Sequence, residues 1–155
     1  YLETKFGGRE QAAQVYARID AAARDAGLEI DFGAIARTPN TIDAHRLIHW
    51  AGVEGRQTAA VSALFDAYFR HGRDIGDAEV LADIADGIGL DASVVARLLQ
   101  GDADRDAIAE RDAAAREMGI SAVPTFIVAG QHAVPGAQPP ETWTRVIDEL
   151  GGKTA

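Results

Sequence analysis

The feature that most constrains this sequence is one short β-rich stretch in a chain that otherwise has helical periodicity. Residues 124–128, Pro-Thr-Phe-Ile-Val, are followed by an Ala-Gly-Gln turn and a second short run at residues 132–134. This pattern predicts a β-hairpin. The apolar side chains of the first run alternate onto both faces, which is typical of a central strand that is covered on both sides.

A two-stranded hairpin alone is marginally stable in water, so the predicted sheet is incomplete. The only further strand that the sequence suggests is a short apolar stretch at residues 29–32. The remaining strands would lie upstream of this sequence, would come from a partner, or would be hidden in segments predicted here as helices. We favour the upstream explanation, because the sequence starts at Tyr1 and not at an initiator Met.

Residues 1–118 are predicted to be mostly helical. Apolar residues recur at spacings of three and four in residues 9–26, and Gly27 supplies a helix stop. A charged helix rich in Ala, Arg, Asp and Glu is predicted over residues 102–118 and is closed by Gly119.

Polar residues mark the expected starts of the helices between these two. Asn40 is predicted to be an N-cap, with Asp43 three residues later as an acidic form of the capping box. Asp77 and Asp91 are predicted to begin two shorter helices.

Two predicted helices have strongly apolar faces. The first contains residues 61–69, and its predicted buried face comprises Val61, Leu64, Phe65, Tyr68 and Phe69. The last begins at the Pro139-Pro140 pair, and its predicted buried face comprises Trp143, Val146, Ile147 and Leu150. Trp50 is also expected in the core.

Composition excludes several kinds of function. The net charge of −9, without a basic run, argues against binding to nucleic acid. No apolar run approaches the roughly 20 residues that cross a bilayer. The sequence has no cysteine, which excludes disulfides, thiolate metal sites and a thiol nucleophile within it. His45 and His49 lie one helical turn apart, but no third ligand accompanies them in a recognised motif, so no metal site is predicted.

Four segments in this order resemble one known family. They are residues 40–47 (Asn-Thr-Ile-Asp-Ala-His-Arg-Leu), residues 68–77 with Tyr-Phe and Asp-Ile-Gly-Asp, residues 119–126 (Gly-Ile-Ser-Ala-Val-Pro-Thr-Phe) and residues 134–141 (Val-Pro-Gly-Ala-Gln-Pro-Pro-Glu). Together they resemble FrnE-like proteins of the DsbA family, and the resemblance covers nearly the whole chain.

The resemblance implies an α/β protein with a thioredoxin-like fold into which a helical domain is inserted. Residues 1–118 would form the helical insertion, and residues 119–155 would form the C-terminal part of the thioredoxin-like domain. In this family, the first strand and the helix after it carry a Cys-x-x-Cys pair. The chain resembles the family from beyond that element onward, so we expect the strand, the helix and the dithiol upstream, and no catalytic residue within this chain.

The resemblance also assigns a role to Val123, Pro124 and Thr125. The equivalent proline of thioredoxin folds is cis and faces the dithiol, and it presents the backbone of the preceding residue to an extended substrate. Local sequence alone favours a trans proline at the start of a strand. With the resemblance we expect the cis form and a substrate-binding role for these three residues.

Two further groups are candidate substrate-binding residues. In the related glutathione-using kappa-class transferases and chromene-carboxylate isomerases, an Asn-Thr segment borders the thiol site, which suggests such a role for Asn40, Thr41 and His45. Sequence alone favours helix capping for Asn40. In the same relatives, the loop after the hairpin helps to hold the thiol, which suggests a role for Gly136, Ala137 and Gln138. A plain glycine turn explains that loop equally well.

The predicted function is that of a DsbA/FrnE-like thiol–disulfide oxidoreductase, with no cofactor, acting on protein or small-molecule disulfides or thiols. One alternative is a glutathione-dependent isomerase or transferase, in which glutathione is a substrate. Another is a non-catalytic thioredoxin-fold module that binds peptides. No nucleic-acid or membrane partner is expected, a homodimer is compatible with the sequence, and the resemblance suggests a cytoplasmic location.

Overall fold

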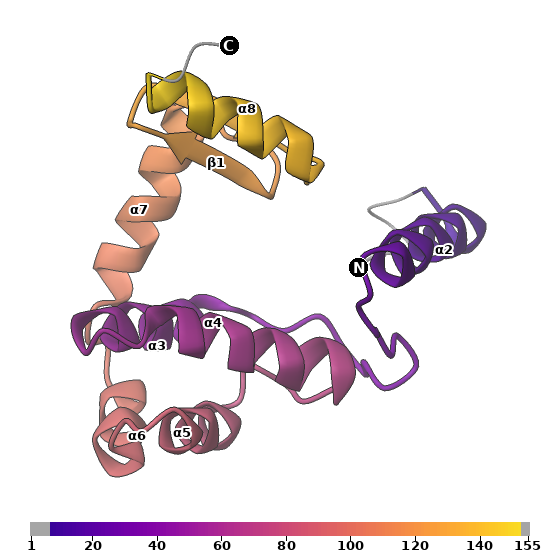
Figure 1. Cartoon of the computed structure of the whole chain (residues 1–155). Helices are drawn as coiled ribbons and strands as arrows, with labels where there is room; N and C mark the ends of the chain where they lie inside the picture. Colours follow the sequence, from indigo (N-terminus) through magenta and orange to yellow (C-terminus); the bar gives the residue numbers. More distant parts are fainter. Residues whose placement is uncertain (1–6, 153–155) are drawn as a thin grey trace. The chain divides into compact units, whose positions relative to one another are not determined.

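The computed structural model describes residues 7–152, and the chain divides into two compact units, residues 1–109 and residues 110–155. The division falls inside one helix, α7 (Arg105–Glu117). Figure 1 shows the elements of both units in sequence colours.

The first unit is helical, as predicted. Its elements are α2 (Arg9–Asp25), α3 (Ile42–Val53), α4 (Gln57–Phe65), the π-helical turn η1 (Asp66–Arg70), α5 (Ala78–Gly87) and α6 (Ala92–Gln100). Helices α3 and α4 pack against each other, and so do α5 and α6, with α5 also contacting both α3 and α4 (Figure 1). The stretch at residues 29–32 is not a strand, so the prediction of a possible strand there is wrong. Its backbone belongs to the connection between α2 and α3.

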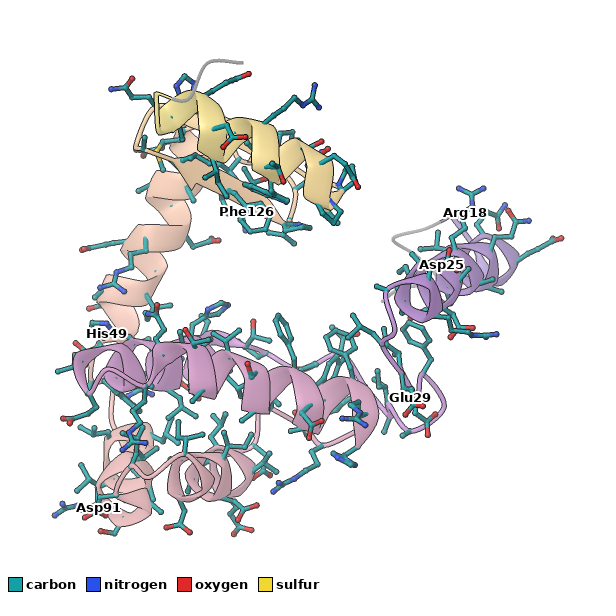
Figure 2. The ribbon with its side chains drawn as sticks, viewed as in Figure 1. Arg18, Asp25, Glu29, His49, Asp91 and Phe126 are labelled. Atoms are coloured by element: carbon teal, nitrogen blue, oxygen red, sulfur yellow. The ribbon has the colours of Figure 1, made fainter. Side chains whose placement is uncertain are left out.

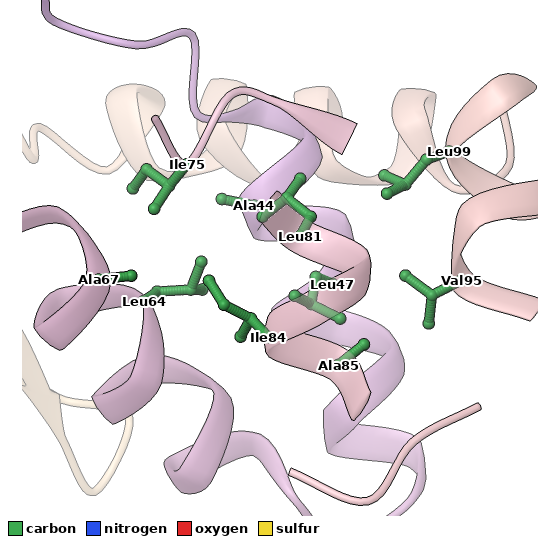
Figure 3. Packing of buried hydrophobic residues seen from close by; sticks show 10 residues of the cluster. All are labelled: Ala44, Leu47, Leu64, Ala67, Ile75, Leu81, Ile84, Ala85, Val95 and Leu99. Carbon is green, nitrogen blue, oxygen red and sulfur yellow. The ribbon is translucent and has the colours of Figure 1, made fainter. Parts of the chain in front are cut away.

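One apolar cluster holds α3 to α6 together. Leu47 from α3 and Leu81 from α5 are completely buried, and each contributes about 2 kcal/mol by leaving water. Figure 3 displays the cluster, which comprises Ala44, Leu47, Leu64, Ala67, Ile75, Leu81, Ile84, Ala85, Val95 and Leu99. Trp50 packs against it with its side chain partly buried.

The helix starts confirm two of the predicted caps and correct a third. The carboxylates of Asp77 and Asp91 accept hydrogen bonds from the first-turn N–H groups of α5 and α6. Helix α3 begins one residue later than predicted, with Thr41 at the N-cap position. Asn40 still contributes, because its Oδ1 accepts a 3.1 Å hydrogen bond from the Ile42 N–H.

Asp43 does not complete a capping box, so that prediction is wrong. Its Oδ1 accepts hydrogen bonds from Arg46 Nη1 and from Arg105 Nη2, both at 2.9 Å. Two guanidinium groups attract a carboxylate more strongly than a neutral backbone N–H does. One of them lies 62 positions away in the sequence, so a local pattern could not reveal it.

Arg46 explains why Asp43 points away from the helix start. The Arg46 side chain is completely buried. Its Nε donates to the Ala103 carbonyl at 2.7 Å, and its Nη2 donates to the Leu98 and Gly101 carbonyls at 2.6 and 2.8 Å. A buried charge is tolerated when its donors are satisfied in this way. Arg46 therefore fixes the turn that connects α6 to α7.

The predicted apolar face of residues 61–69 is only partly correct. Leu64 is buried, but Phe65 is 60% exposed, so its assignment to the core is wrong. Phe65 is the last residue of α4, and the helices that pack against α4 cover Leu64 and leave Phe65 outside the core cluster. The π-helical turn begins only at Asp66, and it changes the 3.6-residue period for the residues that follow. Ala67 occupies a buried position in its place.

The second unit contains the predicted hairpin and the final helix. Strand β1 (Thr125–Val128) pairs antiparallel with β2 (His132–Pro135), and helix α8 (Pro140–Leu150) follows. Phe126, labelled in Figure 2, packs edge-on against Trp143 of α8 with ring centroids 4.8 Å apart. This contact joins the hairpin to the helix.

The predicted buried face of α8 is correct only in part. Trp143 and Val146 are half-buried, whereas Ile147 and Leu150 are 66% and 47% exposed. The two strands that the structure describes in this unit form a narrow sheet, which cannot cover four positions along a helix of 11 residues. The sequence likewise predicts one two-stranded hairpin in this part of the chain.

Candidate functional site

The loop before β1 carries the first group of predicted site residues. The peptide bond between Val123 and Pro124 is cis, the isomer that the family resemblance implied. Val123 is 90% exposed. Within the described part of the chain, the Val123 backbone makes no hydrogen bond. An exposed backbone beside a strand can pair with an extended ligand.

Hydrogen bonds on either side hold this loop in place. Thr125 Oγ1 donates to the Ala122 carbonyl at 2.7 Å, which closes the loop around Val123 and Pro124. Thr125 also begins β1, opposite Pro135 of β2. The sequence predicted these residues as a group, and the structure gives Thr125 a supporting role in the loop.

The second predicted group lies directly beside the first. The Gly136 N–H donates a 2.7 Å hydrogen bond to the Pro124 carbonyl, so the loop after β2 is bound to the loop before β1. Gly136 has a φ of 77°, a left-handed conformation that glycine adopts without the steric cost of a side chain. Gln138 Nε2 donates to the Pro135 carbonyl at 2.7 Å, and Ala137 is exposed. The structure thus brings residues 123–125 and 136–138 together.

The third predicted group belongs to the first unit. Thr41 precedes α3, and its carbonyl accepts a 2.9 Å hydrogen bond from the His45 N–H. Asn40, Thr41 and His45 are all exposed. Asn40 and Thr41 therefore lie at the start of α3, with Thr41 and not Asn40 at the N-cap position. Their exposure also leaves them accessible to a ligand.

Sequence analysis missed the role of Tyr68, which it places only in the core. Its hydroxyl donates to the Arg37 carbonyl at 3.4 Å, close to the segment that leads to Asn40. Burial raises the pKa of Tyr68, with the nearby Tyr16 adding to the effect, so the phenol remains protonated. The Tyr-Phe pair is visible in the sequence as part of a family-like segment, but nothing in its local pattern indicates this contact.

Neither a metal site nor a membrane segment is found in the described residues. Within residues 7–152, no three His, Asp or Glu side chains gather in a way that suits a metal ion. His49, labelled in Figure 2, lies 4.0 Å from Asp104, an ion-pair distance when the imidazole is protonated. Every helix described by the structure is too short or too polar to cross a bilayer.

Comparisons of sequence and of structure with known proteins agree on one family. A family model for the DSBA-like thioredoxin domain matches residues 4–148. The uncharacterised protein YwbO of Bacillus subtilis (strain 168) is 30% identical over 127 residues, which cover 79% of this chain and 62% of YwbO. The crystal structure of a probable DsbA oxidoreductase from Streptomyces coelicolor aligns with a TM-score of 0.84 and 31% identity, over 99% of this chain and 67% of that chain.

The chain thus spans just under two thirds of the length of the curated relative. The family match extends over both units, from the segment before α2 to near the end of α8. The agreement in sequence and in structure shows that this chain belongs to the DSBA-like thioredoxin domain family and has a thioredoxin-like fold.

Proposed function

We propose that this chain forms the substrate-binding part of a FrnE-like thiol–disulfide oxidoreductase. The observation that carries the proposal is the exposed backbone of Val123, which precedes Pro124 in a loop held by hydrogen bonds at both ends. The solved relative from Streptomyces coelicolor, a probable DsbA oxidoreductase, supports the same class of reaction. The substrate would be a protein or a small molecule that contains a disulfide or a thiol.

The reaction needs two thiols, and this sequence contains no cysteine, so the thiols would lie outside these 155 residues. One thiolate attacks a sulfur of the substrate disulfide, the substrate S–S bond breaks, and a mixed disulfide forms. The other sulfur of the substrate leaves as a thiolate in this first step. The second thiolate of the protein then attacks the mixed disulfide and expels the remaining substrate sulfur, also as a thiolate. The two substrate thiolates take up two protons, and the protein dithiol becomes a disulfide. Two electrons pass from the protein dithiol to the substrate, and the reverse reaction oxidises a substrate dithiol.

In this reaction, Val123 would bind the substrate and the loops around it would keep its position. The N–H and C=O of Val123 would pair with an extended segment of substrate beside its sulfur atom, as an added strand does. Gly136 would not contact the substrate through its N–H, because that group is already bonded to the Pro124 carbonyl. Gly136 and Thr125 would instead stabilise the loop that presents Val123.

A count of reactive thiols in the full natural polypeptide that contains this chain tests the proposal. Intact mass after alkylation should reveal two thiols that are lost on oxidation and recovered with a dithiol reductant. A single reactive thiol, or a serine in place of the Cys-x-x-Cys pair at the start of the helix after the first strand, would favour the glutathione-dependent alternative. A natural polypeptide without any reactive thiol would refute the oxidoreductase and favour a peptide-binding module.

A further inference from the structure

The connection between α2 and α3 is bound to the helical core along much of its length. It includes Glu29, labelled in Figure 2, and ends at Asn40 and Thr41, two of the three predicted substrate-binding residues of the first unit. We call residues 31–41 the strap. We infer that Tyr68, Asp74 and Gly76 are positioning residues that set the place of Asn40 and Thr41 through the strap. The inference deepens the proposed function, and it rests on that function together with the predicted role of Asn40 and Thr41 in substrate binding.

The π-helical turn η1 provides the first attachment. The Asp31 N–H donates a 2.8 Å hydrogen bond to the Phe69 carbonyl. Carbonyl groups in the last turn of a helix lack partners within the helix, so the strap satisfies one of them. Asp31 Oδ1 also accepts hydrogen bonds from the N–H groups of Gly33 and Ala34, which folds the start of the strap into a turn. The strap is therefore anchored where it reaches the helix.

Gly72 allows the strap to pass close to the end of the same helix. A Cβ placed on Gly72 would overlap the carbonyl group of Ala34. Gly72 also has a φ of 61°, which disfavours any larger residue. Glycine at this position thus allows the left-handed backbone that ends the helix, and it also leaves room for the strap to pass.

Asp74 and Tyr68 hold the middle of the strap. Arg37 Nε donates to Asp74 Oδ2 at 2.6 Å, while the other oxygen of Asp74 accepts from the Gly76 N–H at 2.9 Å. The Tyr68 hydroxyl donates to the Arg37 carbonyl at 3.4 Å. Asp74 therefore holds the side chain of Arg37, and Tyr68 holds the backbone carbonyl of Arg37.

Gly76 sets the end of the strap by direct contact. A Cβ on Gly76 would lie 2.9 Å from the Asn40 carbonyl oxygen, which is closer than real Cβ atoms approach. It would also lie 3.1 Å from Asp74 Oδ1 and 3.3 Å from Pro39 Cβ, which are tight contacts. The two neighbours on the strap are a backbone carbonyl and a proline ring, neither of which can rotate away as a flexible side chain does. We therefore expect an added methyl group to shift the backbone at the contact between Gly76 and Asn40. The family-like segment at residues 68–77 and the one at residues 40–47 meet at this contact.

A pair of glycine variants tests the positioning directly. Gly76→Ala should shift the backbone amide NMR signals of Asn40, Thr41 and Ile42 and weaken their protection from hydrogen exchange. Gly87→Ala is the matched control, because Gly87 has an ordinary φ and nothing lies within 4 Å of an added Cβ. Gly87→Ala should leave these signals unchanged. Equal spectra at residues 40–42 for Gly76→Ala and the wild type would overturn the inference.

Two polar variants address the middle of the strap. Asp74→Asn keeps an acceptor for Gly76 but loses the charge that holds Arg37, and Tyr68→Phe removes only the hydroxyl group. Both should move the signals of residues 37–41. Asp20→Asn, which breaks an exposed ion pair with Arg24 in α2, is the control and should not move them. If neither Asp74→Asn nor Tyr68→Phe moves them, these two residues do not position the strap.

A third measurement links the positioning to the substrate. In the full natural polypeptide, Gly76→Ala should raise KM for glutathione disulfide by about two- to tenfold, the effect of one lost hydrogen bond, with kcat unchanged. KM for bis(2-hydroxyethyl) disulfide, which is too small to reach far beyond its sulfur atoms, should not change. An equal rise in KM for both disulfides would refute a role for the strap in substrate binding. So would an unchanged KM for both disulfides in a variant whose amide signals move.

These measurements separate the inference from the proposed function. If the wild-type natural polypeptide reduces neither disulfide, the proposed function fails, and with it the substrate role of the strap. The amide signals still decide whether Tyr68, Asp74 and Gly76 position Asn40. If the wild type is active and the signals do not move, the inference fails alone.

Discussion

The Gly136 N–H donates a 2.7 Å hydrogen bond to the Pro124 carbonyl, and this bond joins the two loops that flank the hairpin of the second unit. It turns two candidate segments, which the sequence could only name separately, into one structural group. Val123 belongs to this group and is 90% exposed. The proposed site therefore depends on a hydrogen bond between two backbone groups, which the pattern of side chains in the sequence does not reveal.

Replacing Gly136 tests this contact. Gly136→Ala places a Cβ on a left-handed residue, which costs about 1–2 kcal/mol, and it should shift the amide signals of Val123 and Thr125. Gly130 also has a positive φ, and an added Cβ there meets nothing within 4 Å. Gly130→Ala should therefore lose similar stability in urea unfolding without moving those signals. Identical spectra for the two variants would show that Gly136 does not hold the loop.

Arg46 should be essential to the stability of the first unit. Arg46→Met leaves three backbone carbonyls without their donor and removes one of the two guanidinium partners of Asp43, which should cost about 3–5 kcal/mol of unfolding free energy. Arg97, which is exposed on α6, gives the control, and Arg97→Met should change stability by at most about 0.5 kcal/mol. Urea unfolding followed by circular dichroism measures both. A loss below about 1 kcal/mol for Arg46→Met would contradict its role in fixing the turn between α6 and α7.

The cap of α6 should respond to acid. The Ser93 hydroxyl, and the backbone N–H groups of Val94 and Ser93, lower the pKa of Asp91 from its ordinary value of 3.8. A carboxyl whose pKa is lower in the folded state stabilises the fold above the unfolded-state pKa. That stabilisation is lost as the pH falls through the folded-state pKa. The contribution of Asp91 should therefore be complete near neutral pH, and it should begin to decline as the pH falls below about 4.

Ser93→Ala removes the largest cause of this shift. NMR titration of the Asp91 carboxyl group should then give a pKa closer to the ordinary value than in the wild type. Ser62 is exposed on α4, away from this cap, and Ser62→Ala should leave the titration unchanged. A pKa of Asp91 that is the same in Ser93→Ala and in the wild type would contradict the assigned cause.

Local patterns predicted the elements of the fold well. The caps at Asp77 and Asp91, the stop at Gly27 and the hairpin around Gly130 all arise from interactions within a few residues, so a single sequence contains the information. The family resemblance added the thioredoxin-like fold, which the family match and the solved relative show.

Long-range contacts account for the errors. Phe65 fits a core position on a 3.6-residue period, but the helices that pack against α4 cover Leu64 and leave Phe65 60% exposed. Asp43 matches a capping pattern, but Arg105 lies too far along the sequence for that pattern to include it. The contact between Gly76 and Asn40 depends on the path of the strap, which local periodicity does not describe.

The most direct test of the central claim is the rate at which the thiols of the full natural polypeptide react with glutathione disulfide. If the substrate binds at Val123, Val123→Asp should slow this reaction about fivefold, because a carboxylate about 4 Å from the anionic substrate costs about 1 kcal/mol in water. Val53→Asp makes the same change at another exposed valine, which is 75% exposed at the end of α3, and should leave the rate unchanged. Equal rates for Val123→Asp, Val53→Asp and the wild type would contradict a substrate site at Val123.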